Sequence, residues 1–116
     1  MKEIVIIIRP EKLETVKEIL SNRQCGGMTI SSVMGCGTQR GATEQTVNVI
    51  KGFKTNINLL PKIRVEAVVK DETVEDIIAD IRDKVATGNV GDGKIFLRSM
   101  EDAIRIRTGE RGDKAL

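Results

Sequence analysis

The spacing of apolar residues alternates between strand-like and helix-like twice along this chain, in the same order each time. Residues 3–9 form a near-continuous apolar run, which is typical of a strand covered on both faces. Pro10 then opens a stretch with apolar residues at helical spacing, and the glycine pair of residues 23–27 ends it. Residues 28–35 alternate loosely and predict a second strand.

The same succession follows after a long interval. Residues 62–69 alternate as a third strand, and Val74, Ile77, Ile78, Ile81 and Val85 mark a clear amphipathic helix. Residues 94–97 predict a fourth strand and residues 104–107 a short fifth. Between the two units, residues 35–58 lack a periodic apolar pattern, and loops of this size are usually functional or disordered.

Two strand–helix–strand units in 116 residues predict a single α+β domain spanning residues 1–116. The expected architecture is a ferredoxin-like double βαβ sandwich, with an antiparallel sheet and both helices on one face. Because no third helix is available for the other face, we expect a second copy of the chain to cover it.

Composition excludes several classes of function. The 19 basic and 17 acidic residues are interspersed, which indicates neither a nucleic-acid nor a membrane partner. The chain has no His, Trp or Tyr, which excludes a phosphohistidine nucleophile, an aromatic base-stacking platform and tyrosine modification. Without a signal peptide or a long apolar span we expect a cytoplasmic protein, with Cys25 and Cys36 as reduced thiols.

The glycine-rich stretch of residues 87–94 suits phosphate oxygens. Gly91 and Gly93 can expose backbone N–H groups without a Cβ, and Lys94 supplies a positive charge. The stretch is not a Walker A loop, because here a helix precedes it and a strand follows. By itself it is weak evidence, because a glycine-rich connection from helix to strand is more often a structural turn.

Two further segments carry candidate binding residues. Arg105 and Arg107 are two positions apart, so on an extended segment both guanidinium groups would face one side and suit a polyphosphate; a charged strand edge is the alternative. Glycines surround Gln39 at the start of the long loop, where backbone N–H groups could take a carboxylate and the Gln39 oxygen a magnesium ion. Cys36 could be redox-active, although no base or resolving cysteine neighbours it in the sequence.

Taken together, these segments resemble the PII nitrogen-regulatory signalling proteins. The resemblance covers nearly the whole chain, in "RPEKLETVKEIL", "GGMTISSVMGCGTQRGATE", "LLPK", "ATGNVGDGKIF" and "EDAIRIRTGERG". It implies a homotrimer of ferredoxin-like subunits with clefts between neighbours that bind ATP or ADP and, with MgATP, 2-oxoglutarate. It also implies a sensor that is not an enzyme.

Roles carried over from the family fall on matched positions of this chain. The resemblance implies that phosphates lie on residues 91–94 of one subunit and on Arg105 and Arg107 of its neighbour. The implied nucleotide-binding residues are Ile7, Thr29, Gly35, Gly37, Val68, Thr87, Gly91, Asp92, Gly93, Lys94, Arg105 and Arg107. Gln39 would help hold Mg²⁺, and the implied 2-oxoglutarate-binding residues are Gly37, Gln39, Arg40, Gly41 and Lys62.

The long loop, residues 37–58, departs most from the family pattern. It is about four residues longer than the usual family loop and has no tyrosine, and its distal part forms an apolar cluster flanked by cations. We expect this part to bind a partner, with an ammonium transporter as first candidate, through Val49, Ile50, Lys51, Gly52, Phe53 and Lys54.

Other functions remain open at this point. The family also includes regulators associated with nitrogenase. A structural or metal-responsive ferredoxin-like trimer would share the fold, but its metal sites favour imidazole or soft donors, and this chain has only two cysteines. A nucleoside-diphosphate kinase would require the histidine that is missing.

Overall fold

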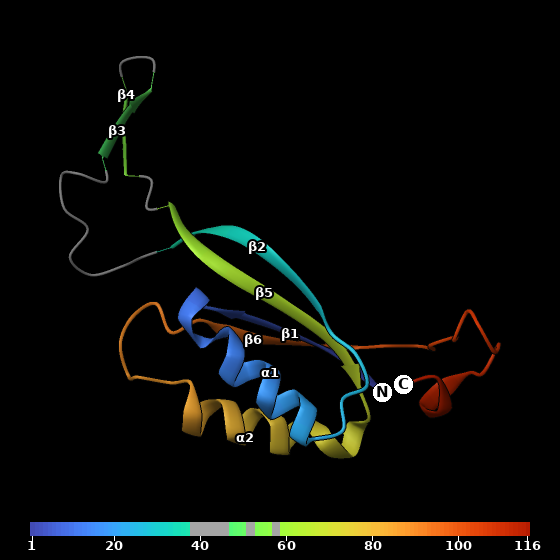
Figure 1. Ribbon diagram of the computed structural model, residues 1–116. Coiled ribbons are helices and arrows are strands. Elements are labelled where there is room, and N and C mark those ends of the chain that lie inside the picture. The colour runs from blue at the N-terminus through green and yellow to red at the C-terminus, as the bar shows by residue number, and fades with distance from the viewer. Residues whose placement is uncertain (38–46, 51–52, 57–58) are drawn as a thin grey trace.

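The computed structural model describes residues 1–37, 47–50, 53–56 and 59–116, and for residues 47–50 and 53–56 it describes the backbone (Figure 1). Short 3-10 helices at Pro10–Lys12, Asp71–Thr73 and Gly112–Ala115 accompany the main elements. Those elements are β1 (Lys2–Ile8), α1 (Leu13–Asn22), β2 (Thr29–Cys36), β3 (Val47–Ile50), β4 (Phe53–Asn56), β5 (Leu59–Val69), α2 (Val74–Lys84) and β6 (Lys94–Ser99).

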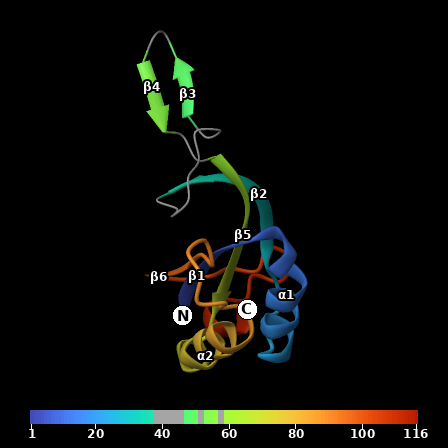
Figure 2. The same cartoon turned by 90° about the vertical axis from the view of Figure 1, so that its left-hand side faces the viewer.

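The main sheet has four strands in the order β2-β5-β1-β6, and every neighbouring pair is antiparallel. In the central register Ile6 lies opposite Val65 on one side and opposite Ile95 on the other. Both helices pack on the same face of this sheet, as the two perpendicular views show (Figures 1 and 2). The predicted ferredoxin-like fold is therefore confirmed.

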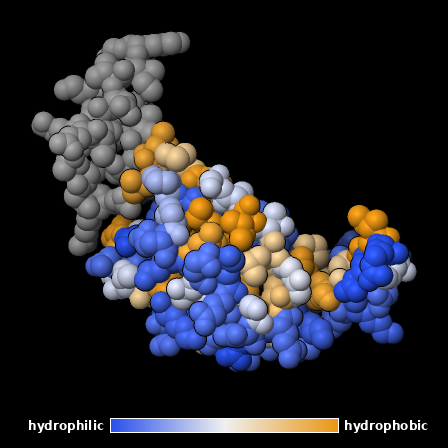
Figure 3. All heavy atoms as spheres, viewed as in Figure 1, coloured by the Kyte–Doolittle hydropathy of each residue, from blue (hydrophilic) through white to orange (hydrophobic). Residues whose placement is uncertain are grey.

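The core lies between the sheet and the helices, where the apolar periods of both meet. Alternate β1 residues Ile4, Ile6 and Ile8 are buried there together with Val65, Ala67 and Val69 of β5. The helices contribute the residues that their spacing predicted, among them Val16, Ile19, Leu20, Val74, Ile77 and Ile81. The solvent side of the helices is polar, as the blue lower surface in Figure 3 shows. The Arg23 Nε at the end of α1 also donates to Asp80 Oδ2 of α2 at 2.8 Å.

No helix among the described residues covers the opposite face of the sheet. This face is mixed in character, and not apolar throughout as expected: Phe96 is 54% exposed, while Arg98 pairs with Glu3 at 3.0 Å. Arg64 Nε also lies 2.6 Å from Glu66 Oε1. On the side away from the helices, the sheet therefore presents apolar and charged groups together.

The third predicted strand begins three residues earlier than expected. β5 starts at Leu59 and includes Pro61, which lies opposite Met34 of β2. Because β1 pairs with β5 only as far as Ile63, the missing N–H of Pro61 interrupts no hydrogen bond on that side.

The long loop contains a hairpin that the sequence reading missed. β3 and β4 pair antiparallel, with Ile50 opposite Phe53, and this two-stranded ladder is separate from the main sheet. Part of the signal was present, because Val47 and Val49 alternate with Asn48 and a two-residue step that contains glycine follows Ile50. Residues 51–52 themselves lie outside the described residues.

The prediction of a fifth strand at residues 104–107 is wrong. Residues 106–108 form a turn, and within the described chain this segment has a single bridge, between Ile104 and Arg111. The Asp102 carboxylate accepts hydrogen bonds from the backbone N–H groups of Ala103 and Gly112 and pairs with Arg111. These bonds favour a compact turn, so Arg105 and Arg107 do not share a strand face.

Candidate functional site

A pocket of about 320 Å³ lies at one end of the sheet, where β1, β2, β5 and β6 meet the loop of residues 87–93. It brings together seven residues that the sequence analysis proposed for ligand binding. The lining residues are Ile7, Gly35, Cys36, Gly37, Leu60, Lys62, Gly91, Gly93, Lys94 and Phe96.

The charge of this pocket is suited to an anion. Lys62 on β5 and Lys94 at the start of β6 both line it, and no carboxylate does. The apolar walls come from Ile7, Leu60 and Phe96. Two ammonium groups beside exposed glycine backbone can hold phosphate or carboxylate oxygens. The described residues contain no group of three or more Cys, Asp or Glu side chains placed to hold a metal.

The loop of residues 87–93 is closed by its own aspartate. The Asp92 carboxylate accepts hydrogen bonds from the Thr87 N–H at 2.7 Å, the Thr87 hydroxyl and the Gly88 N–H at 2.9 Å. The Thr87 hydrogen bonds hold the pKa of Asp92 below its usual range, with smaller help from Gly88 and Arg9. The Asp92 and Thr87 side chains thus shape the loop, and the Asp92 N–H itself donates to the Asn89 oxygen at 3.4 Å.

Gly93 is a position where the fold permits no other residue. Its φ is +112°, and a Cβ built there would lie 1.8 Å from the Ile7 carbonyl oxygen. The loop is therefore pressed directly onto the end of β1. This contact places Lys94 next to Ile7, its partner in the β1–β6 ladder.

Two cations from the sheet hold consecutive carbonyl groups of the loop. Lys62 Nζ donates to the Gly91 oxygen at 2.7 Å. Arg9, directly after β1, donates through Nη2 to the Val90 oxygen at 2.8 Å. The sequence analysis did not single out Arg9, and nothing in its local sequence marks a partner 81 positions away.

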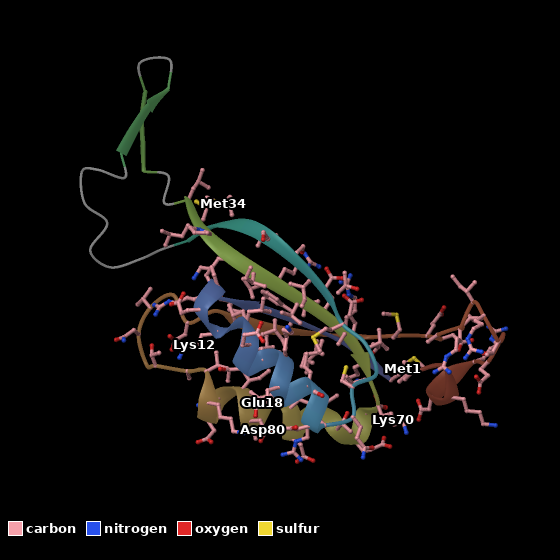
Figure 4. The ribbon with its side chains drawn as sticks, viewed as in Figure 1. Met1, Lys12, Glu18, Met34, Lys70 and Asp80 are labelled. Carbon is pink, nitrogen blue, oxygen red and sulfur yellow. The ribbon has the colours of Figure 1, made fainter. Side chains whose placement is uncertain are left out.

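Four of the predicted nucleotide-binding residues outside the loop of residues 87–93 are not among those that line this pocket: Thr29, Val68, Arg105 and Arg107. Thr29 and Val68 line a hollow of about 380 Å³ with Glu3 and Glu66, and Val68 also borders one with Arg105. In Figure 4, Met34 marks the pocket end of β2, while Met1 and Lys70 mark the opposite end of the sheet. Arg105 Nη2 donates a hydrogen bond to the Leu116 oxygen at 3.3 Å. Arg107 is exposed.

Several predicted residues cannot be placed. Gln39, Arg40 and Gly41 lie outside the described residues, as do Lys51 and Gly52 of the predicted partner-binding cluster. Phe96, which the sequence analysis did not propose, lines the pocket. Its position two residues after Lys94 on the same strand was the signal that could have found it.

The fold and the pocket define a class: a small ferredoxin-like domain with a pocket that is framed by glycines and lined by two lysines. The family model "Nitrogen regulatory protein P-II" matches residues 1–110. The chain belongs to this family of nitrogen regulatory proteins. The family resemblance seen in the sequence is therefore confirmed.

Similar proteins cover the whole chain. It is 49% identical over 116 residues to "Nitrogen regulatory protein P-II 2" of Methanothermobacter thermautotrophicus, covering 100% of this chain and 97% of the relative. It is 45% identical to "Nitrogen regulatory protein P-II" of Haemophilus influenzae and 44% to that of Rhodospirillum rubrum, with complete coverage of both chains. These relatives are named as regulators, which supports a role in nitrogen signalling. Among the described residues, no helix has the length and apolar character needed to cross a membrane.

Proposed function

We propose that this protein signals nitrogen and energy status as a homotrimer. In this proposal ATP or ADP binds in the clefts between subunits, 2-oxoglutarate joins MgATP there, and residues 37–58 transmit the state of the cleft to a partner. An ammonium transporter is the first candidate for that partner.

The observation that carries the proposal is the division of the predicted nucleotide-binding residues between two ends of the sheet. Ile7 lies opposite Lys94 at one end, whereas Val68 lies opposite Glu3 at the other. Glu3 and Ile7 are four positions apart on β1, which is about 14 Å. Lys94 and Arg105 of one chain therefore line different hollows.

Association of subunits resolves this separation. If the Lys94 end of one subunit meets the Arg105 end of the next, both groups can contact one nucleotide. Such a head-to-tail contact closes into a ring when the rotation between copies is right. The face of the sheet that no helix of the described residues covers offers a surface for this assembly, and the family resemblance supports three copies.

The pocket chemistry supports the choice of ligands. Lys94 and the glycine backbone suit phosphate oxygens, and Lys62 suits a carboxylate of 2-oxoglutarate. Magnesium prefers oxygen donors, which Gln39, the phosphates and the keto acid would supply. A metal shared by both ligands would make 2-oxoglutarate binding depend on MgATP.

Calorimetric titration of the full chain tests this proposal. We expect ATP and ADP to bind, and 2-oxoglutarate to bind in the presence of MgATP but not of ADP. Sedimentation should report a trimer. Lys62→Gln should weaken 2-oxoglutarate binding by more than tenfold while nucleotide binding persists. A trimer that binds no nucleotide would instead support the structural or metal-responsive alternative.

A further inference from the structure

The loop of residues 87–93 depends on two cations for its peptide orientations. Lys62 and Arg9 donate to the carbonyl oxygens of Gly91 and Val90 at 2.7 Å and 2.8 Å. They differ in location, because Lys62 lines the pocket while Arg9 is not among its lining residues. Arg9 therefore contacts the loop from outside the space that a ligand would occupy.

Each of these hydrogen bonds also sets the direction of a backbone N–H. In a trans peptide the carbonyl and the following N–H point in opposite directions. Holding the Val90 oxygen therefore orients the Gly91 N–H, and holding the Gly91 oxygen orients the Asp92 N–H. Gly91 has a φ of +99° and tolerates many conformations, so its own backbone does not restrict this choice.

An anion in the pocket would compete for one of the two cations. Lys62 is an ammonium on a flexible stem, and a bound carboxylate or phosphate would attract it away from the Gly91 oxygen. The guanidinium of Arg9 would stay on the Val90 oxygen, since it lies outside the pocket. At that moment Arg9 would be the cation that still holds the loop.

We infer that Arg9 is a positioning residue for ligand binding, which acts by fixing the peptide between Val90 and Gly91. It does not touch the ligand. Its hydrogen bond keeps the Gly91 N–H oriented toward an anion in the pocket. It does so both before and after Lys62 leaves the Gly91 oxygen. The identity of the anion in this inference rests on the proposed function. The hydrogen bond by which Arg9 fixes the loop does not depend on it.

Three variants of the full chain test this role. Arg9→Met removes the donor and keeps an apolar stem, while Arg9→Lys restores a cationic donor. Arg82→Met is the matched control, because Arg82 is an exposed arginine on α2 shortly before the loop and donates to no loop carbonyl in the described part of the chain.

Two readouts are needed: ATP affinity by calorimetry, and amide ¹⁵N resonances of the ligand-free protein. Arg9→Met should weaken ATP binding about tenfold, Arg9→Lys should recover most of this loss, and Arg82→Met should bind like the wild type. The Gly91 amide resonance should move in Arg9→Met but keep its position in Arg82→Met.

The inference would be overturned if the wild type binds ATP and Arg9→Met binds it equally well. An equal loss in Arg82→Met would also overturn it, because the effect would then be one of general charge. If the wild type binds no nucleotide, the proposed function fails. The Gly91 amide resonance then still decides whether Arg9 fixes the loop, since an unmoved Gly91 signal in Arg9→Met would refute the inference.

Discussion

At the scale of single residues, the site depends on how closely a loop approaches a strand. Gly93 sits against the Ile7 carbonyl with a positive φ, so both space and backbone conformation exclude a side chain. Gly88, at the start of the same loop, also has a positive φ, of +85°. A Cβ built on Gly88 would have no atom within 4 Å. The two glycines therefore separate backbone strain from steric contact.

Gly93→Ala should lower the free energy of unfolding by about 3 kcal/mol, because the loop must leave β1 or the strand must shift. Gly88→Ala, the matched control, should lower it by about 1 kcal/mol, from conformational strain alone. Urea denaturation followed by circular dichroism measures both, at one protein concentration because assembly affects stability. Equal losses in the two variants would mean that the contact with Ile7 has no energetic importance.

At the scale of elements, the C-terminal segment differs from the extended strand that its alternation predicted. Arg105 N–H donates to the Glu110 oxygen at 2.9 Å, and Gly109 N–H donates to the Arg105 oxygen at 2.7 Å. The Arg105 guanidinium also lies 3.5 Å from a Glu110 carboxylate oxygen. Within one chain this arginine contacts its own segment, while Arg107 projects from the turn into solvent.

We predict that Arg105→Ala or Arg107→Ala weakens ATP binding by about ten- to hundredfold, because each would remove a charge-assisted hydrogen bond to phosphate. Assembly should survive both changes. Arg111→Ala is the control, since it removes the ion pair with Asp102 in the same segment but no proposed phosphate contact. If calorimetry shows wild-type ATP affinity in both arginine variants, Arg105 and Arg107 are surface charges without a role in ATP binding.

At the scale of the whole molecule, the proposed output element is the loop that contains the β3–β4 hairpin. A hairpin suits this role because it presents residues of both strands to a partner on a compact frame. Its strands include Val49, Ile50, Phe53 and Lys54 of the predicted partner-binding cluster. A short stretch of sequence joins the pocket residue Gly37 to this hairpin. A ligand bound beside Gly37 would therefore be close, along the chain, to the residues that lead into the hairpin.

Partner binding should be at least about tenfold tighter with ADP than with MgATP plus 2-oxoglutarate, because a ligand switches a partner only through differential affinity. Pull-down of an ammonium transporter encoded beside this protein, under both ligand conditions, measures the difference. Replacing residues 47–56 with a short glycine linker should abolish capture while leaving nucleotide binding intact. Equal capture under both conditions, or full capture by the shortened loop, would locate the output elsewhere.

The sequence by itself determined the fold class and much of the pocket. Apolar periods of two and 3.6 residues identify strands and helices because each element must bury one face, and this local rule located α2 and the core residue Ile77. The same holds for Gly91, Gly93 and Lys94, whose chemistry is readable without coordinates. Family resemblance added Ile7 and Lys62, which no local pattern marks.

Only the tertiary structure decided which distant residues meet. The hydrogen bonds from Arg9 to Val90 and from Lys62 to Gly91 join segments 81 and 29 positions apart, and no periodicity encodes such a pair. The alternation at residues 104–107 predicted a strand, but a strand needs a neighbour to receive its backbone hydrogen bonds. Asp102 and two glycines with positive φ stabilise a turn in this segment instead. Local pattern states what a segment can form, and the available partners decide which form it takes.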